Sequence, residues 1–256
     1  MSRKIIVVTA AYGYETVRAA GGQVAMLPVI AQSGAQGVEI RREMFSVEEL
    51  NHLPSLAHTI RKHNLQACYS APEPLYLPDS SLNPQIPALL EEARTLNAQW
   101  LKVSLGHFGQ DPAVETLQRW LADAGVPLVV ENDQTECGQL PIMQRFQVTC
   151  HALRLPITLT FDMGNWLWAG SSPEEAAHQL APSVSYIHVK AAVPYQNTFC
   201  AIAPEPASSR WLALLQLLPT EAPLGIEFPL EGPDLTAVTQ YYVTLLRKAG
   251  TARVDT

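Results

Sequence analysis

The sequence predicts an α/β fold, a single closed (β/α)8 barrel of the TIM type that spans residues 1–256. Eight short apolar runs recur along the chain, and a stretch with the apolar spacing of a helix follows each of them. Strands that alternate with helices run parallel, which leaves a closed barrel or an open doubly wound sheet. The open sheet usually carries a glycine-rich phosphate turn after its first strand, and no such turn is present. The count of eight favours the barrel.

The expected strands are short runs rich in β-branched and other apolar residues. In chain order they lie at 4–10, 37–40, 65–70, 100–105, 126–132, 156–162, 184–190 and 223–228. Helices are expected near 22–34, 46–63, 84–97, 111–125, 138–155, 173–181, 208–218 and 233–249. The segment 191–209 is long for a connection between a strand and a helix, and loops of that length are often functional lids.

Several helix boundaries carry the residues that helix ends prefer. Expected starts are Ser46 with Glu49 as a capping box, Ser172-Pro173, and Asp111-Pro112; expected ends are Gly34, Gly125 and Gly250. Pro28 conflicts with its helical pattern unless that helix begins near Val24, because only the first turn tolerates proline.

Composition excludes several classes of protein. A net charge of −7 argues against non-specific nucleic-acid binding, which needs a basic face. No apolar run approaches the roughly 20 residues of a membrane span, and the apolar run from Ile5 to Ala11 is too short for a signal peptide. The four cysteines form no CxxC pair, which favours free thiols. A cytoplasmic protein is therefore expected.

Four polar residues end or interrupt apolar runs that should be buried on both faces. They are Glu131, Asp162, His188 and Glu227, one in each of the last four predicted strands. The carboxyl ends of barrel strands face one shared pocket, so these side chains should meet there. A buried carboxylate is costly unless it is paired, protonated or bound to a metal ion.

An ion-pair network with Lys102 and Lys190 is one explanation, but two lysines offer little compensation for the whole set. A metal site is the favoured alternative. Three oxygen ligands and one nitrogen ligand suit Mn²⁺, Mg²⁺, Co²⁺ or Zn²⁺, with coordination positions left open for substrate oxygens.

The strings VVENDQT, TFDMGNW, YIHVKA and IEFPL, which fall in order at barrel spacing, resemble the xylose isomerase-like TIM-barrel superfamily. That superfamily contains sugar-phosphate isomerases, ketose 3-epimerases and endonuclease IV-like proteins. Within it, the combination of SLG, VENDQT, FDMGNW and HVKA is most similar to epimerases associated with bacterial 2-ketogluconate utilisation. The resemblance covers the whole chain.

The resemblance implies that Glu131, Asp162, His188 and Glu227 are metal ligands and that the two glutamates act as acid and base. Two positions depart from the pattern of the superfamily. Asn165 stands where relatives often carry histidine, and Ala191 stands where many carry aspartate. Neither departure removes a ligand, but both put the substrates of the better-known members in doubt.

Further polar and aromatic residues near the strand ends are candidates for substrate binding. Arg41 is explained equally well as a solvated loop residue, Trp166 as a pocket wall, and Arg210 by packing at a helix start. Glu39 either bonds a substrate hydroxyl or orients Lys102. The full set of candidates is Lys102, Lys190, His107, Arg41, Asn165, Trp166, Glu39 and Arg210.

The functional hypothesis is a metal-dependent isomerase or epimerase that removes a proton α to a carbonyl. Its substrate would be a small keto-sugar, a sugar phosphate or a keto-sugar acid. The alternatives are a non-catalytic barrel that binds sugar acids and, less favoured, an endonuclease IV-like nuclease, which would need more histidine ligands and a basic face. No nucleic-acid or membrane partner is expected, and a homodimer, common among relatives, stays open.

Overall fold

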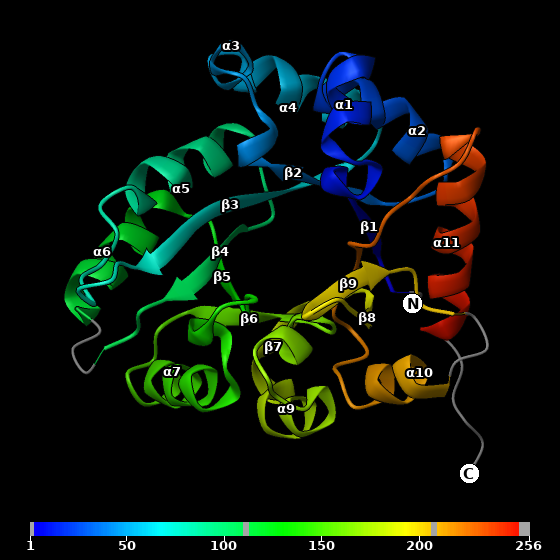
Figure 1. Ribbon diagram of the computed structural model, residues 1–256. Coiled ribbons are helices and arrows are strands. Elements are labelled where there is room, and N and C mark those ends of the chain that lie inside the picture. Colours follow the sequence, from blue (N-terminus) through cyan, green and yellow to red (C-terminus); the bar gives the residue numbers. More distant parts are fainter. Residues whose placement is uncertain (1–2, 110–112, 206–208, 251–256) are drawn as a thin grey trace.

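The computed structural model describes residues 3–109, 113–205 and 209–250, and its centre is a closed barrel of parallel strands (Figure 1). Around the barrel the strands follow the order β1-β10-β7-β6-β5-β4-β3-β2. This is the (β/α)8 barrel that the sequence predicts. Its strands are β1 (Ile5–Val8), β2 (Gly37–Arg41), β3 (Gln66–Tyr76), β4 (Leu101–Gly106), β5 (Leu128–Glu131), β6 (Ile157–Asp162), β7 (Val184–Val189) and β10 (Leu224–Ile226).

All eight predicted apolar runs form barrel strands, although several ends differ from the prediction; β1, for example, ends at Val8 instead of residue 10. The third strand was expected to end at residue 70, but β3 continues to Tyr76. Its register against β4 shifts between Ser70 and Pro74, and this irregularity lets the strand continue past the expected end. The last strand is shorter than predicted, so Glu227 follows β10 directly instead of lying within it.

The longer helices surround the barrel (Figure 1). The α-helices are α1 (Tyr14–Ala20), α2 (Leu27–Gln32), α3 (Val47–Leu50), α4 (Leu53–Lys62), α5 (Ile86–Thr95), α6 (Val114–Ala124), α7 (Leu140–Ala152), α8 (Asn165–Trp168), α9 (Pro173–Leu180), α10 (Ser209–Gln216) and α11 (Leu235–Ala249). Short 3-10 turns lie at Thr9–Tyr12, Gln23–Met26, Arg42–Met44, Glu136–Gly138 and Ala181–Ser183. Within the described residues, no helix has both the length and the hydropathy that crossing a membrane requires.

The helix ends follow the sequence signals where the structure describes them. Ser46 and Glu49 form the expected capping box at α3, and Ser172 caps α9 by accepting a hydrogen bond from the Glu175 amide. Gly125 ends α6 in the left-handed conformation. Pro28 lies in the first turn of α2, so the conflict at this proline disappears. The expected start at 111–112 lies outside the described residues.

Two helices have no counterpart in the predicted pattern. In α1 only Val17 is buried, so the helix has almost no apolar periodicity to detect. Helix α8 is a single turn after β6, too short for its apolar periodicity to be detected in the sequence. By contrast, α5 buries Ile86, Leu89, Leu90 and Ala93, the spacing of one helix face against the barrel.

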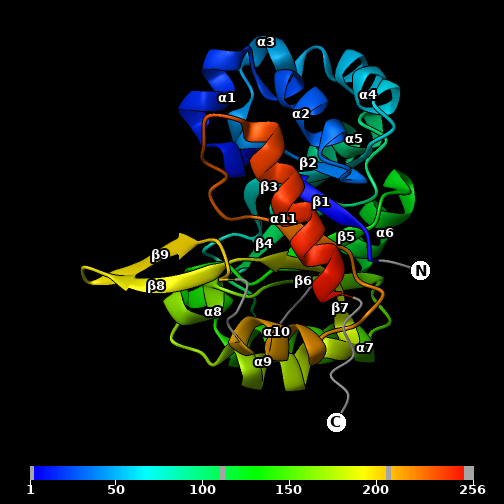
Figure 2. The same cartoon turned by 90° about the vertical axis from the view of Figure 1, so that its right-hand side faces the viewer.

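The segment after β7 was expected to be a long loop, and much of it forms regular structure instead. Residues 191–202 form an antiparallel hairpin of β8 (Ala191–Tyr195) and β9 (Thr198–Ile202), and that part of the prediction is wrong. The hairpin leaves the barrel at the carboxyl end of β7 and projects well beyond it (Figure 2). It therefore forms a wall beside the end of the barrel where the polar strand ends meet.

Gly225 is the point where β10 passes closest to the side chains of β7. A Cβ atom at this position would clash with the Tyr186 hydroxyl and lie 2.8 Å from Cδ2 of His188. We therefore expect Gly225→Ala to lower the free energy of unfolding by about 1–3 kcal/mol, because overpacking forces neighbouring side chains off their rotamers. Urea unfolding followed by circular dichroism measures this difference, and an alanine variant as stable as the parent would contradict the close packing.

Candidate metal centre

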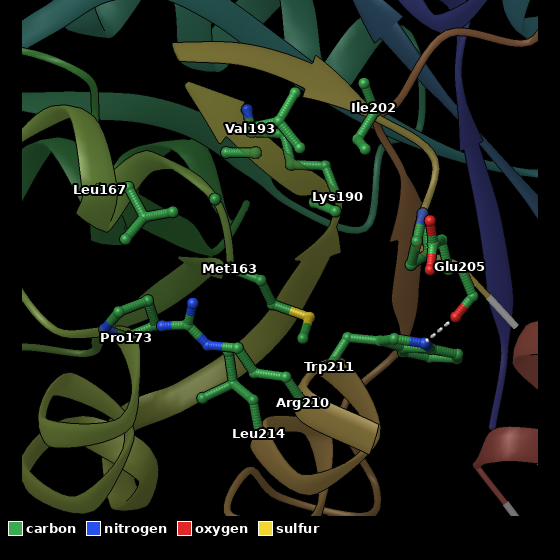
Figure 3. A pocket seen from close by; sticks show the side chains of 14 residues that line it. Met163, Leu167, Pro173, Lys190, Val193, Ile202, Glu205, Arg210, Trp211 and Leu214 are labelled. Carbon is green, nitrogen blue, oxygen red and sulfur yellow. Dashed lines mark hydrogen bonds between the residues drawn. The ribbon is translucent and has the colours of Figure 1, made fainter. Parts of the chain in front are cut away.

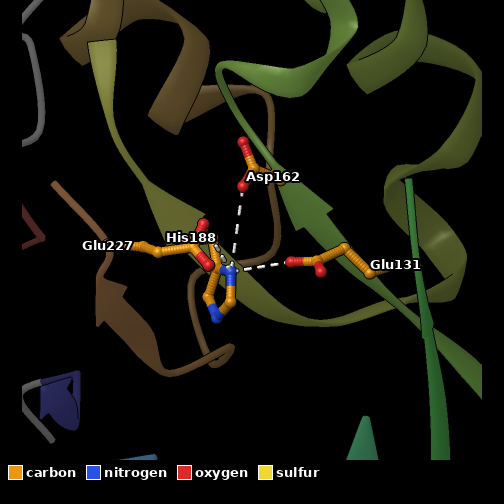
Figure 4. Close-up of side chains that lie close together, drawn as sticks. All are labelled: Glu131, Asp162, His188 and Glu227. Atoms are coloured by element: carbon orange, nitrogen blue, oxygen red, sulfur yellow. Dashed lines mark ion pairs between the residues drawn. The ribbon is translucent and has the colours of Figure 1, made fainter. Parts of the chain in front are cut away.

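Glu131, Asp162, His188 and Glu227 converge at the carboxyl end of the barrel (Figure 4). Glu131 ends β5, Asp162 ends β6, His188 lies near the end of β7, and Glu227 directly follows β10. One potential ligand atom from each lies within 4.8 Å of all the others. Nδ1 of His188 is 2.7 Å from Glu131 Oε1, 3.1 Å from Glu227 Oε2 and 3.8 Å from Asp162 Oδ2.

Three of these ligand atoms are buried and form no hydrogen bond, namely Glu131 Oε1, Asp162 Oδ2 and His188 Nδ1, although Lys190 Nζ forms an ion pair with Asp162 Oδ2. Asp162 and His188 are fully buried, and the Glu131 side chain is 14% exposed. Unsatisfied buried oxygen and nitrogen atoms are rare in folded proteins because each costs free energy. Atoms that point at one another around a common point are the arrangement that a cation satisfies, so the side chains fit a metal ion.

Three positively charged side chains border the cluster. Lys102 Nζ lies 2.7 Å from Glu131 Oε2, and Lys190 Nζ lies 2.7 Å from Asp162 Oδ2 and 2.9 Å from Glu227 Oε2. Arg41 reaches the other oxygen of Glu227 at 2.9 Å. Lys102 therefore holds the outer oxygen of Glu131, whereas Lys190 contacts Asp162 Oδ2 and Glu227 Oε2, the same oxygens that face His188 Nδ1. These lysines do not remove the need for a further positive charge among the ligand atoms.

Glu39 and Tyr186 contact His188 on the side of the ring that faces away from the other carboxylates. Glu39 is fully buried on β2, and its Oε2 lies 2.8 Å from His188 Nε2 and accepts a hydrogen bond of 2.8 Å from the Tyr186 hydroxyl. Because Glu39 accepts at Nε2, that nitrogen carries a proton, and Nδ1 is the nitrogen that faces the other carboxylates and can bind a metal ion once it is deprotonated. The Tyr186 ring also packs edge-on against the imidazole, with ring centroids 4.8 Å apart.

The charges of the cluster shift the ionisation of its members. Burial alone would lower the pKa of His188, but the neighbouring carboxylates, Glu227 first, raise it well above its ordinary value. Burial would raise the pKa of Glu227, but His188 and Lys190 hold it well below its usual range. Burial raises the pKa of Asp162 above normal against the opposing charge of Lys190. Without a cation, the cluster therefore holds a proton on His188.

Metal binding should release that proton. A ligand nitrogen must be deprotonated, so we expect about one proton to leave per metal ion bound and the affinity to fall as the pH is lowered. Calorimetric titration with Zn²⁺ or Mn²⁺ in two buffers of different ionisation enthalpy measures the protons released. A binding enthalpy that does not depend on the buffer, with an affinity that does not depend on pH, would contradict this expectation.

The predicted substrate-binding residues divide into two groups. Lys102, Lys190 and Arg41 contact the carboxylates of the cluster, and Glu39 contacts His188. Asn165 lies close by but is engaged: its amide donates to the Asn132 carbonyl and its oxygen accepts from Gln134. The structure therefore gives Asn165 a part in holding the loops after β5 and β6.

Three of the predicted residues do not reach the cluster. Trp166 is 1% exposed and packs on Phe161 with ring centroids 5.3 Å apart, so it belongs to the core. His107 is exposed on the loop after β4. Arg210 lies in the first turn of α10, pairs with Glu174 at 2.8 Å and lines a separate pocket.

Sequence reasoning missed two residues that shape the centre. Tyr186 was read only as part of an apolar strand, yet it lies two residues before His188 and so on the same face of β7, a spacing that could have pointed to it. Gly225 leaves the space that both rings occupy, and a lone glycine in a short strand gave no distinguishing signal.

The fold and this cluster together define the class of structure. The chain is a closed (β/α)8 barrel with three carboxylates and one imidazole at the carboxyl end of its strands. Comparison of the sequence with protein-family models gave no match, and comparison with curated proteins gave none. Solved structures do match over nearly the whole chain.

Three solved structures illustrate the likeness. An IolI protein with a bound zinc atom matches with a TM-score of 0.70 and 14% identity, covering 96% of this chain and 96% of its own. A xylose isomerase domain-containing protein from Salmonella typhimurium gives 0.68 and 14%, covering 94% and 95%. A D-allulose 3-epimerase from Methylomonas sp., in complex with D-allulose, gives 0.64 and 11%, covering 97% and 98%. At these identities the likeness establishes the fold.

Proposed function

We propose that this protein is a metal-dependent isomerase or epimerase that moves a proton at a carbon next to the carbonyl of a small keto-sugar or keto-sugar acid. The observation that carries the proposal is the pair Glu131 and Glu227, which approach the ligand cluster from opposite sides (Figure 4). Two carboxylates on opposite sides of a bound carbonyl compound suit proton removal on one face and proton return on the other.

Glu131, Asp162, His188 and Glu227 would hold a divalent cation, Mn²⁺, Mg²⁺, Co²⁺ or Zn²⁺, in keeping with three oxygen donors and one nitrogen donor. When bound, the ion supplies Lewis-acid stabilisation of the negative charge that develops on the substrate oxygens. The zinc atom in the IolI structure and the sugar bound to the epimerase support this assignment by analogy of fold.

The ionisation of the two glutamates suits the first step. Burial would raise the pKa of Glu131, but Lys102 and His188 lower it, and the pKa of Glu227 lies well below normal. Both carboxylates are therefore ionised at neutral pH, and either can accept the substrate proton. Return of a proton to the opposite face of the same carbon gives epimerisation, whereas return at the neighbouring carbon gives isomerisation.

Proton exchange in D₂O tests the proposal. The protein, loaded with Mg²⁺ or Mn²⁺, would be incubated with a panel of ketoses, 2-keto sugar acids and their phosphates, and deuterium incorporation would be followed by NMR. We expect deuterium next to the carbonyl of at least one compound and loss of the exchange on chelation. Absence of exchange across the panel in protein shown to bind metal would overturn the proposal.

A non-catalytic sugar-acid binder is the second candidate, and one observation favours it. Lys190 contacts both Asp162 and Glu227 at less than 3 Å, so ion pairs already neutralise part of the cluster. Such a protein would bind keto-sugar acids without exchanging their protons. Stoichiometric metal in the purified protein together with deuterium exchange would exclude this candidate.

A further inference from the structure

A pocket of about 230 Å³ lies beside the metal-centre residues, between the base of the hairpin and helices α8, α9 and α10 (Figure 3). Val193 and Ile202 of the hairpin form one wall, and Leu167 and Pro173 form the opposite wall. Trp211 and Leu214 of α10 lie at its base. Most of the side chains that face this space are therefore apolar.

The polar groups around the pocket are already engaged. The Trp211 indole N–H donates to the Glu205 carbonyl at 2.8 Å, so the ring presents its apolar surface. Arg210 pairs with Glu174 at 2.8 Å. Lys190 is held by Asp162 and Glu227. The remaining charged residue of the lining, Glu205, is an exposed carboxylate that would repel an anion.

The pocket adjoins the proposed centre at Lys190 and Gly164. Lys190 lines the pocket, and its amine contacts two of the proposed ligands. The Gly164 amide donates to Asp162 Oδ1, and the same residue forms part of the pocket lining. A molecule whose carbonyl lies among the ligands would therefore lie next to this apolar space, on the other side of Lys190.

We infer that this pocket binds an uncharged apolar substituent of the substrate, of about the size of a six-membered ring. This inference rests on the proposed function and narrows its substrate class to a keto-sugar that carries an aryl or bulky alkyl group in place of a phosphate. The size agrees, because a cavity of about 150 Å³ already accommodates benzene in another protein. Moving a hydrocarbon ring from water to these apolar walls is favourable. Moving a phosphate there would cost the free energy of its lost hydration.

Ligand-observed ¹⁹F NMR tests the inference without any need for turnover. The probe is 4-fluorophenyl β-D-glucopyranoside, added to the Mg²⁺-loaded protein, with methyl β-D-glucopyranoside and glucose 6-phosphate as competitors. We expect saturable broadening of the fluorine signal. The aryl glucoside should bind about 10- to 100-fold more tightly than the methyl glucoside, as expected when an aromatic ring is buried.

Two variants test whether the probe binds in the pocket. Val193→Asp on the hairpin and Leu167→Asp on α8 introduce a charge from opposite walls, and each should weaken binding about tenfold or more. Tyr195→Asp is the matched control, because Tyr195 is 58% exposed on the same hairpin and lies outside the lining. Val193 is 38% exposed and Leu167 is partly buried, so the variants are expected to fold.

The outcomes separate this inference from the proposed function. Failure of the aryl probe to bind, or equal binding by both wall variants and the parent, would overturn the inference even if keto-sugars exchange deuterium. Tighter binding of glucose 6-phosphate that is lost in Arg210→Ala would identify an anion site and overturn it as well. Saturable aryl binding lost in both wall variants, with no deuterium exchange on any compound, would support the pocket and contradict the enzyme.

Discussion

Glu131→Gln and Glu227→Gln should each reduce deuterium exchange by about 10²–10⁴-fold, the contribution of a positioned general acid or base. Glutamine keeps the shape of the side chain and one oxygen that can face a metal ion, but it cannot accept a proton from carbon. The measurement is the initial rate of deuterium incorporation on the most reactive compound of the panel. Metal content by mass spectrometry on the same samples separates loss of the base from loss of the ion.

The matched control for this pair is Glu73→Gln. Glu73 is a partly buried carboxylate on β3 whose ion pair is with Arg42 at 2.8 Å, and it is not a member of the ligand cluster. This variant should retain full exchange. If Glu131→Gln and Glu227→Gln also stay fully active, the acid–base assignment is wrong. If both variants lose metal and regain the rate at high metal concentration, the two glutamates act only as ligands.

Glu39→Gln should weaken metal affinity by about 10- to 100-fold, the usual cost of losing a hydrogen-bond partner behind a ligand histidine. Glu39 accepts from both Tyr186 and His188 and lies 3.4 Å from Lys102. An amide would place an N–H or a neutral oxygen opposite the imidazole and would no longer fix the orientation of the ring. Calorimetric titration of Zn²⁺ into parent and variant gives the affinity ratio.

Glu92→Gln provides a matched comparison, because Glu92 also accepts from a tyrosine hydroxyl and pairs with an arginine, but on α5 outside the barrel. This change should leave metal affinity unaltered. A folded Glu39→Gln protein with the affinity of the parent would show that Glu39 does not position His188. Equal losses in both variants would point to a general loss of stability.

The barrel could be predicted because its signal repeats. Eight apolar runs and the helices between them each carry local information, and the caps at Ser46 and Ser172 add to it. The hairpin could not be predicted in the same way, since Ala191–Tyr195 mixes alanine and proline with only two larger apolar residues. Pairing with Thr198–Ile202 decides its structure, and pairing between strands leaves little trace in a single segment.

The site was predictable to the extent that polar residues interrupt buried strands. Glu131, Asp162, His188 and Glu227 stand out for this reason, and the structure brings them together. Trp166 illustrates the limit, because a large aromatic residue after a strand serves equally as a pocket wall or as core, and here it is core. The residues of the apolar pocket come from elements distant in sequence, so only the folded chain brings them together.

The hairpin also bears on how such a protein can change. Its two ends, Ala191 and Ile202, are paired neighbours, so the turn between them can be lengthened, shortened or exchanged without moving the strands of the barrel. The ligand cluster is built on the barrel, whereas one wall of the pocket is built on the hairpin. Under the proposed function, chemistry and selectivity would therefore lie in separable segments, and we expect a different hairpin grafted onto this barrel to alter substrate choice.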